Sequence, residues 1–317
     1  MSYATFLKSI YFLFIVTFTG LSSAQASGTK LRLALLPIPD VLPVYIALEE
    51  GLFKELGIEV EPLKVGSPIE RDQLMQAARV DGMINEISGA ASFNREQVTV
   101  KIIAVARAPL GESPLFRVLA APGSTIAGVQ ELSGVGIGVS RHTIIEYITS
   151  RLLTANGVAA EDIVFQSVPV LPERFQLLLS GQLQAATLPD PLASAAIKAG
   201  AIDLINDTRL NKLSASVITF SRETLERKGE TVKKFMQGWN RAVEMLNENP
   251  DTYRATLLKN IMVPKNIQES FALPPMPKNT LPSKEQWDDV MQWMVDKNLL
   301  QKPLAYEESV TADFLSK

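Results

Sequence analysis

Polar and charged side chains gather in four short loops, each of which follows a predicted strand and precedes a predicted helix. The loop Ser140-Arg141-His142-Thr143 combines helix-start amides, two hydroxyls and a guanidinium, a set that is able to hold a carboxylate, sulfonate or phosphate. A plainer interpretation is equally open, in which Ser140 caps the following helix and Arg141 faces solvent. His142 is the single histidine and the chain has no cysteine, so the sequence predicts no metal site.

Carboxylates in the other loops favour a different ligand. Asn85 and Glu86 end a predicted strand, and Glu86 has no capping role by position, so it ranks first among the acidic candidates. Asp190 precedes Pro191, a pattern typical of a helix N-cap followed by proline in the first turn, and Asp40 has the same alternative role. Because a carboxylate in a cleft favours an amine or a protonated ring, this acidic set predicts a heterocyclic or amine-bearing ligand.

Aromatic and arginine side chains complete the candidate site. Tyr45 is able to stack on a flat ligand, although an aromatic side chain on a helix more often packs in the core. Arg107 lies just before a predicted crossing between lobes and is either a ligand clamp or part of an interlobe ion pair. The full set of predicted ligand-binding residues is Pro39, Asp40, Tyr45, Asn85, Glu86, Ser88, Arg107, Ser140, Arg141, His142, Thr143, Pro189 and Asp190.

Enzyme signatures are missing from the sequence. There is no GxSxG nucleophile turn, no phosphate-binding P-loop, no HExxH helix and no cysteine nucleophile. The sequence therefore predicts a binding protein without catalytic residues or a cofactor.

Apolar strands and amphipathic helices alternate along the chain. The run from Leu31 to Leu36 is short and mostly apolar, a helix that follows closes at Gly51, and residues 58–61 alternate like a strand. Two such series joined by two crossings predict an α/β protein with two doubly wound αβα lobes and a ligand cleft between them. The predicted limits are 27–115 and 222–317 for the first lobe and 116–221 for the second.

Composition and the N-terminus bound the class of protein. The 317 residues, 46% of them hydrophobic, are enough for two lobes, and a net charge of −3 excludes a basic nucleic-acid footprint.

Residues 1–26 fit a secretory signal peptide, with Lys8, an apolar core and a cleavage site after Ala26. The alternative is an uncleaved membrane anchor, which the short apolar run does not favour. Without cysteine the chain has neither disulfides nor a lipid-attachment residue. We therefore expect a freely diffusing, monomeric periplasmic protein that is not a lipoprotein.

The stretch from Tyr45 to Val60 carries a family resemblance, in the order Tyr45, Ala47, Glu50-Gly51-Leu52-Phe53, Leu56-Gly57-Ile58 and Val60. It resembles the signature near the mature N-terminus of periplasmic solute-binding proteins of ABC importers, in the branch that handles nitrate, sulfonates, taurine and thiamine-precursor pyrimidines. The resemblance extends from Leu31 to about Asn298. It implies a type II periplasmic binding fold, a small-molecule solute such as a pyrimidine, and an inner-membrane ABC permease as partner.

The same resemblance bears on the site and on the alternatives. In this family the "LPDP" segment at 188–191 lies beside the ligand, which favours contact by Pro189 and Asp190. One alternative is an enzyme on the same fold, of the pyrimidine-precursor or menaquinone-precursor type. The fungal pyrimidine synthase that resembles this family uses an iron-binding cysteine cluster, which a chain without cysteine lacks. The other alternative is a ligand-sensing partner of a signalling receptor.

Overall fold

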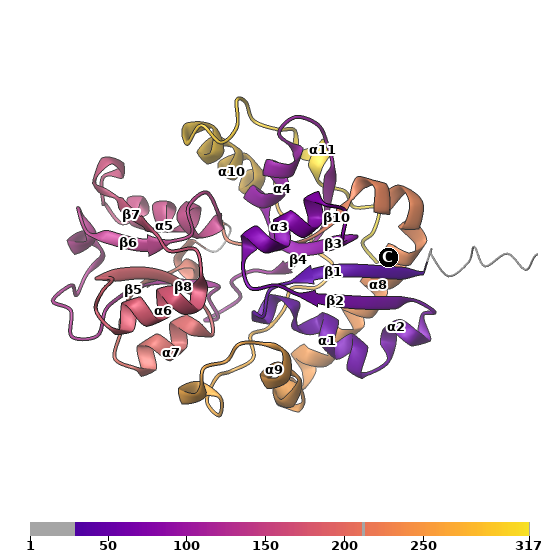
Figure 1. Ribbon diagram of the computed structural model, residues 1–317, viewed down its shortest axis with the longest axis horizontal. Coiled ribbons are helices and arrows are strands. Elements are labelled where there is room, and N and C mark those ends of the chain that lie inside the picture. The colour runs from indigo at the N-terminus through magenta and orange to yellow at the C-terminus, as the bar shows by residue number, and fades with distance from the viewer. Residues whose placement is uncertain (1–28, 211–212, 317) are drawn as a thin grey trace, which may run out of the picture.

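The computed structural model describes residues 29–210 and 213–316. The predicted signal peptide, residues 1–26, lies outside the described residues. Over the described ranges the chain forms two lobes, each built on a five-stranded sheet (Figure 1). The structure confirms the predicted fold class of two α/β lobes.

The first sheet has the strand order β2-β1-β3-β10-β4. β1 pairs in parallel with β2 and β3, whereas β10 runs antiparallel to both β3 and β4. Each residue of β3 is buried, as expected for a central strand covered on both faces. The strands are β1 (Lys30–Leu35), β2 (Glu59–Lys64), β3 (Gly82–Glu86), β4 (Val100–Arg107) and β10 (Ser216–Ser221).

The second sheet has the order β7-β6-β8-β5-β9. β6 pairs in parallel with β7 and β8, and β5 is antiparallel to β8 and β9. Its strands are β5 (Phe116–Ala120), β6 (Gly136–Val139), β7 (Val164–Ser167), β8 (Ala185–Pro189) and β9 (Ile202–Asn206).

One predicted lobe limit differs from the pairing of the strands. The limits 116–221 place β10 in the second lobe, but β10 hydrogen-bonds to β3 and β4 of the first sheet. The chain therefore returns to the first lobe before Ser216, and the C-terminal limit of the second lobe is earlier than predicted.

Helices cover the faces of both sheets (Figure 1). Those of the first lobe are α1 (Leu42–Glu49), α2 (Leu52–Glu55), α3 (Pro68–Gln76), α4 (Ile87–Asn94) and α8 (Arg222–Glu248). Those of the second lobe are α5 (Ile144–Ala155), α6 (Leu171–Leu179) and α7 (Leu192–Lys198). Helices α9 (Arg254–Asn260), α10 (Lys284–Asp296) and α11 (Tyr306–Ser309) follow towards the C-terminus. Short 3-10 helices are η2 (Pro39–Val41), η3 (Val129–Leu132), η4 (Ala160–Asp162), η5 (Asp207–Leu210), η6 (Pro250–Tyr253) and η7 (Lys265–Ile267). None of the helices in the described part of the chain has the length and apolar character needed to cross a bilayer.

Helix α3 begins with a capping box at Ser67 and Glu70. The Oγ of Ser67 accepts a hydrogen bond from the backbone N–H of Glu70 at 3.2 Å, and a Glu70 carboxylate oxygen accepts one from the N–H of Gly66 at 2.7 Å. Pro68 occupies the first turn, where its missing N–H costs no helical hydrogen bond. This start fixes α3 so that its middle, around Arg71, faces β3.

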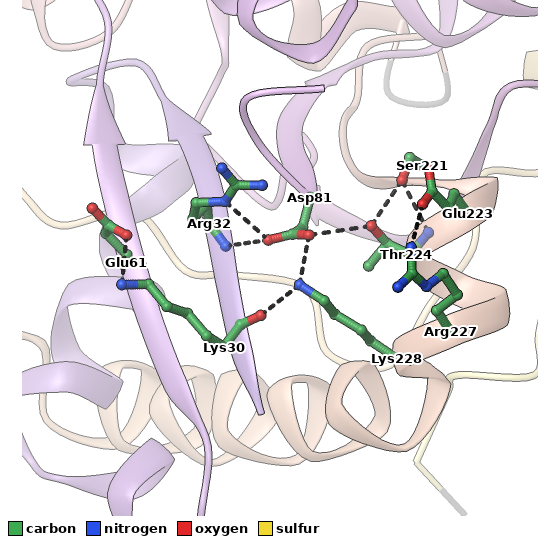
Figure 2. A network of polar contacts seen from close by, with 9 residues as sticks. All are labelled: Lys30, Arg32, Glu61, Asp81, Ser221, Glu223, Thr224, Arg227 and Lys228. Carbon is green, nitrogen blue, oxygen red and sulfur yellow. Dashed lines mark hydrogen bonds and ion pairs between the residues drawn. The ribbon is translucent and has the colours of Figure 1, made fainter. Parts of the chain in front are cut away.

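A polar network holds α8 against the first sheet (Figure 2). The Asp81 carboxylate, which directly precedes β3, accepts hydrogen bonds from the backbone N–H of Arg32 and from the Nζ of Lys228, both at 2.8 Å. Lys228 also donates to the carbonyl oxygen of Lys30 at 2.8 Å, and its backbone has non-helical angles, φ −125° and ψ 25°, inside α8. The network lies at the amino end of β3, so it leaves the carboxyl end of that strand free to form a site.

The C-terminal segment contacts both lobes. Helix α10 packs against α4 of the first lobe, and its Asp289 accepts hydrogen bonds from the Tyr147 hydroxyl at 2.6 Å and from the Arg151 Nε at 2.8 Å, both on α5 of the second lobe. The Nδ2 of Asn266, in η7, donates to the carbonyl oxygen of Ala195 on α7 at 2.9 Å. The lobes are therefore joined by the C-terminal segment as well as by the two crossings.

Candidate functional site

A cavity lies between the two lobes, at the carboxyl ends of β3 and β4. Its volume is about 60 Å³, and the empty space including the open solvent at its mouth is about 690 Å³. The inner part has room for on the order of four to six water molecules. The first lobe, with the crossings, contributes Leu36, Ile38, Asp40, Val41, Pro68, Arg71, Ile84, Asn85, Glu86, Arg107, Leu115, Ala215 and Ser216. The second lobe contributes Phe116, Ser140, Thr143, Ile144, Ile145, Leu171 and Pro189.

Glu86 is paired with an arginine that the sequence analysis did not identify. Nη1 of Arg71 donates to Oε2 of Glu86 at 2.9 Å, and Nη2 donates to Oε1 at 3.2 Å, a two-pronged contact between buried side chains. Burial raises the pKa of the Glu86 carboxyl, and the positive charge of Arg71 works against that rise. Arg71 also donates to the Asp72 carboxylate at 2.8 Å.

Asp40 is also paired with an arginine, through a single contact. Nη1 of Arg107 lies 3.2 Å from the Asp40 carboxylate, and Nη2 donates to the carbonyl oxygen of Pro114 at 2.9 Å. Arg107 thus links η2 to the first crossing between the lobes. Since both cavity carboxylates contact a guanidinium, the acidic excess that the sequence analysis expects is absent among the described lining residues.

Ser216 lies between these two ion pairs. On β10 it is the partner of Glu86 on β3 and of Arg107 on β4, and directly opposite residues project to the same face of a sheet. The Ser216 side chain lines the cavity, and its Oγ has no hydrogen-bond partner. Asn85, the residue before Glu86 on β3, also lines the cavity; its Nδ2 has no partner, while its Oδ1 accepts from the Thr219 hydroxyl at 2.6 Å. Buried polar atoms without a partner are uncommon, and these two belong to residues that line the cavity, where a ligand could supply the missing hydrogen bonds.

The second lobe presents the start of α5. Thr143 is the N-cap residue: its Oγ1 accepts from the Ile145 N–H at 3.1 Å and donates to the carbonyl oxygen of Ser140 at 2.8 Å. The cap is therefore Thr143, whereas the sequence interpretation assigned the capping role to Ser140. The Ser140 hydroxyl instead contacts Nη2 of Arg174 and donates to the Pro169 carbonyl oxygen at 3.3 Å.

Arg174 is a buried guanidinium behind this wall. It donates from Nε to the carbonyl oxygen of Val168 at 2.8 Å and from Nη1 to that of Thr187 at 2.9 Å. Burial lowers the pKa of Arg174 to about 9. Arg174 is absent from the cavity lining, so its direct role is to hold Ser140 in place.

Several predicted site residues point elsewhere. Arg141 pairs with Glu146 at 3.2 Å and lies over the Phe165 ring, and the backbone N–H of His142 donates to Glu146 at 2.7 Å. Tyr45 packs in the core of the first lobe, where burial raises its pKa to about 12. None of these three residues is part of the described cavity lining.

Pro39, Ser88 and Asp190 are also outside the described cavity lining. Asp190 accepts hydrogen bonds from the Ser194 backbone N–H at 2.9 Å and from its hydroxyl at 2.6 Å, which is the local capping role that the sequence analysis left open. The Oγ of Ser88 is buried without a partner in the first turn of α4. The predicted residues that line the cavity are Asp40, Asn85, Glu86, Arg107, Ser140, Thr143 and Pro189.

A metal is not indicated by the side chains. Across residues 29–210 and 213–316, no group of three or more His, Asp or Glu side chains is arranged to hold a metal ion.

Two α/β lobes with a cavity between them, lined at strand ends by both lobes, define the two-lobed fold of periplasmic binding proteins. A family model described as NMT1/THI5 like matches residues 38–253, and the chain belongs to this family. A search of curated proteins gave no match.

Solved structures share the fold at low sequence identity. The ligand-binding component of an ABC-type import system from Staphylococcus aureus, with zinc bound, has a TM-score of 0.75 at 13% identity, over 90% of this chain and 97% of that one. The alkanesulfonate-binding protein SsuA from Xanthomonas axonopodis pv. citri, bound to MOPS, has a TM-score of 0.75 at 18% identity, over 89% and 98% of the two chains. The periplasmic aliphatic sulphonate-binding protein SsuA from Escherichia coli has a TM-score of 0.73 at 16% identity, over 89% and 92%.

Proposed function

We propose that this protein is the extracytoplasmic solute-binding component of an ABC importer. It captures a small polar organic solute in the cavity between its lobes and delivers that solute to a permease in the inner membrane. The observation that carries the proposal is the cavity itself, which draws its walls from both lobes and holds unpartnered polar atoms of Asn85 and Ser216. A solute that completes its contacts only when both lobes surround it favours the closed state.

The family and the similar structures support this role. The chain belongs to the NMT1/THI5 like family, and the structures with which it shares its fold include components of ABC-type import. We propose a periplasmic location, reached through the signal peptide at residues 1–26, and a monomeric state. A receptor that releases its solute to a permease acts by opening and closing.

Release of a bound small molecule tests the proposal. We would purify the protein from the periplasm, denature it, and identify the released compounds by mass spectrometry. The proposal predicts about one solute molecule per chain, since one cavity holds one ligand.

A blocking variant makes this test specific to the cavity. Ile144 is half-buried on the cavity wall, so Ile144→Trp fills the space while the core stays packed. Val164→Trp, on exposed β7, is the matched control. Solute that is retained by wild type and by Val164→Trp but lost from Ile144→Trp supports the proposal, whereas equal retention by all three places the binding site elsewhere.

A further inference from the structure

We infer that the cavity selects solutes without net charge, and that Arg71 and Arg107 set this selectivity by neutralising the two cavity carboxylates. The inference rests on the proposed function, because it names the class of solute that the same site takes. That class is an uncharged compound with a mainly apolar body and at least one hydrogen-bond acceptor.

The first step is the balance of charge. Among the described residues that line the cavity, the charged ones are Asp40, Arg71, Glu86 and Arg107. Each carboxylate contacts one guanidinium, at 2.9 Å for Arg71 and Glu86 and at 3.2 Å for Arg107 and Asp40. Two positive and two negative groups give a lining with no net charge.

The second step is the cost of adding a charge to this lining. All four of these side chains are buried, so the ion pairs are poorly screened by solvent. A charged solute would have to leave water without finding an uncompensated counter-charge, or would have to break an existing pair. An uncharged solute avoids both costs.

The third step is the hydrogen bonding that remains. The Nδ2 of Asn85 is a donor, and the Ser216 hydroxyl is both a donor and an acceptor; both side chains are more than nine-tenths buried, and these atoms have no partner. A carbonyl oxygen or an unprotonated ring nitrogen is able to accept from Asn85 or from Ser216. Such a group carries no charge, in agreement with the first two steps.

The fourth step is the remainder of the lining. Apolar side chains from both lobes form the rest of the lining beside these polar and charged groups, among them Leu36, Ile84, Leu115, Phe116 and Leu171. They bury the body of a ligand, and the polar groups fix its orientation. The site therefore favours a neutral ring compound over a compact inorganic ion.

Two pairs of ring compounds test the inference: benzenesulfonamide, which is uncharged at neutral pH, against the anion benzenesulfonate of nearly equal shape, and uncharged benzyl alcohol against the cation benzylamine. We would measure the affinity of the mature protein for each by calorimetry and by thermal shift. We expect the uncharged member of each pair to bind at least tenfold more tightly than the charged one. Equal or tighter binding of a charged compound overturns the inference.

A metabolite extract separates this inference from the proposed function. The extract is divided by ion exchange into uncharged, anionic and cationic fractions, and each is tested for its effect on the melting temperature. Stabilisation by the uncharged fraction supports the inference. Stabilisation by a charged fraction alone overturns it but leaves the solute-binding function standing, and no stabilisation by any fraction or compound contradicts the function itself.

Removing either the positive or the negative partner of the Arg71–Glu86 pair should shift the ligand preference in opposite directions. Arg71→Met leaves Glu86 without its counter-charge and is expected to raise the affinity for benzylamine at least tenfold. Because Arg71 also contacts Asp72, the double variant Glu86→Gln with Asp72→Asn is needed to leave Arg71 without a carboxylate, and it is expected to raise the affinity for benzenesulfonate at least tenfold. Arg71→Lys keeps the charge and is expected to keep the preference of the wild type. If Arg71→Met does not fold, Arg107→Met takes its place, because it removes the counter-charge of Asp40 and should also raise the affinity for benzylamine. Folded variants that show the same ligand preference as the wild type overturn the inference.

Discussion

Arg71 and Glu86, fifteen residues apart in the chain, meet in a two-pronged contact on the wall of the interlobe cavity, with nitrogen to oxygen distances of 2.9 and 3.2 Å. The capping box at Ser67 sets the start of α3, and β3 delivers Glu86 at its carboxyl end. Glu86, which the sequence analysis predicts to be an acidic ligand contact, is therefore one half of an ion pair with no net charge. The chemistry of the cavity follows from this pairing and from that of Arg107 with Asp40.

Removing Arg71 should destabilise the protein strongly. Arg71→Met leaves the Glu86 carboxylate buried without its partner, a change that costs about 3 to 5 kcal/mol of unfolding free energy at neutral pH. Because the lone carboxyl has a raised pKa, it is protonated more readily in the folded state, so the loss should shrink as the pH falls. Chemical denaturation at several pH values measures both effects.

Two variants control this prediction. Arg241→Met removes an exposed partner of Glu55 and should cost less than about 1 kcal/mol. The double variant Arg71→Met with Glu86→Gln should recover much of the lost stability, because no unpaired charge remains. A double variant as unstable as Arg71→Met alone would show that packing, not charge, explains the loss.

Asp207 should make the stability depend on pH. This carboxylate, at the second crossing, accepts hydrogen bonds from the backbone N–H groups of Leu115, in the first crossing, and Phe116, at the start of β5, at 2.9 and 3.2 Å. Burial raises the pKa of Asp207 from 3.8 to about 6, and the hydrogen bonds only partly oppose the rise. Between these values the folded state retains a proton that the unfolded chain has lost, so stability falls as the pH rises, by about 1.4 kcal/mol per pH unit.

The asparagine of Asp207→Asn has no titratable carboxyl group, so the variant should lose this dependence of the unfolding free energy on pH. The prediction concerns the slope and not the absolute stability of the variant at any one pH. Urea unfolding of both proteins across the interval from pH 3.8 to about 6 measures the difference in slope. If the unfolding free energy of wild type and of Asp207→Asn changes equally with pH, other titratable groups cause the dependence.

Ser216 should matter for binding and little for folding. Its Oγ has no partner in the structure, so Ser216→Ala removes no intramolecular hydrogen bond and should leave the melting temperature of the ligand-free protein nearly unchanged. The solute should bind roughly two- to tenfold more weakly, since one hydrogen bond contributes about 0.5 to 1.5 kcal/mol. Titration calorimetry with the released solute provides the measurement, and Ser92→Ala, on α4 outside the described lining, is the control. Unchanged affinity in Ser216→Ala would remove this hydroxyl from the site.

The contact between α10 and α5 should steady the two lobes against each other. Asp289→Ala removes the acceptor for both Tyr147 and Arg151, so we expect faster amide hydrogen exchange in α10 and weaker solute binding. The neighbouring substitution Asp288→Ala removes an exposed pair with Lys284 and should change neither. Equal exchange in the two variants would exclude this contact as an interlobe link.

The fold was largely predictable because its signals are local. The apolar run at 31–36, the helix that closes at Gly51 and the alternating residues 58–61 are signals that act within a few residues, and the structure forms β1, α1 and β2 there. The membership of β10 in the first sheet was harder to predict, because strand pairing depends on contacts far apart in the chain.

The site was only partly predictable for the same reason. Loops after strands supplied Asn85, Glu86 and Ser140, which line the cavity. Arg71 lies within a helix between charged neighbours, where it resembles any solvated arginine, and only the fold brings it to β3. Ser216 begins a strand and carries no local signal of a site. Tyr45, conversely, follows a pattern that serves core packing.

Small-angle X-ray scattering of the protein, with and without a saturating amount of the solute that it releases, tests the central claim most directly. If the two lobes close on a solute held between them, the radius of gyration decreases on binding. A solute that saturates the protein and leaves the radius of gyration unchanged would contradict the account.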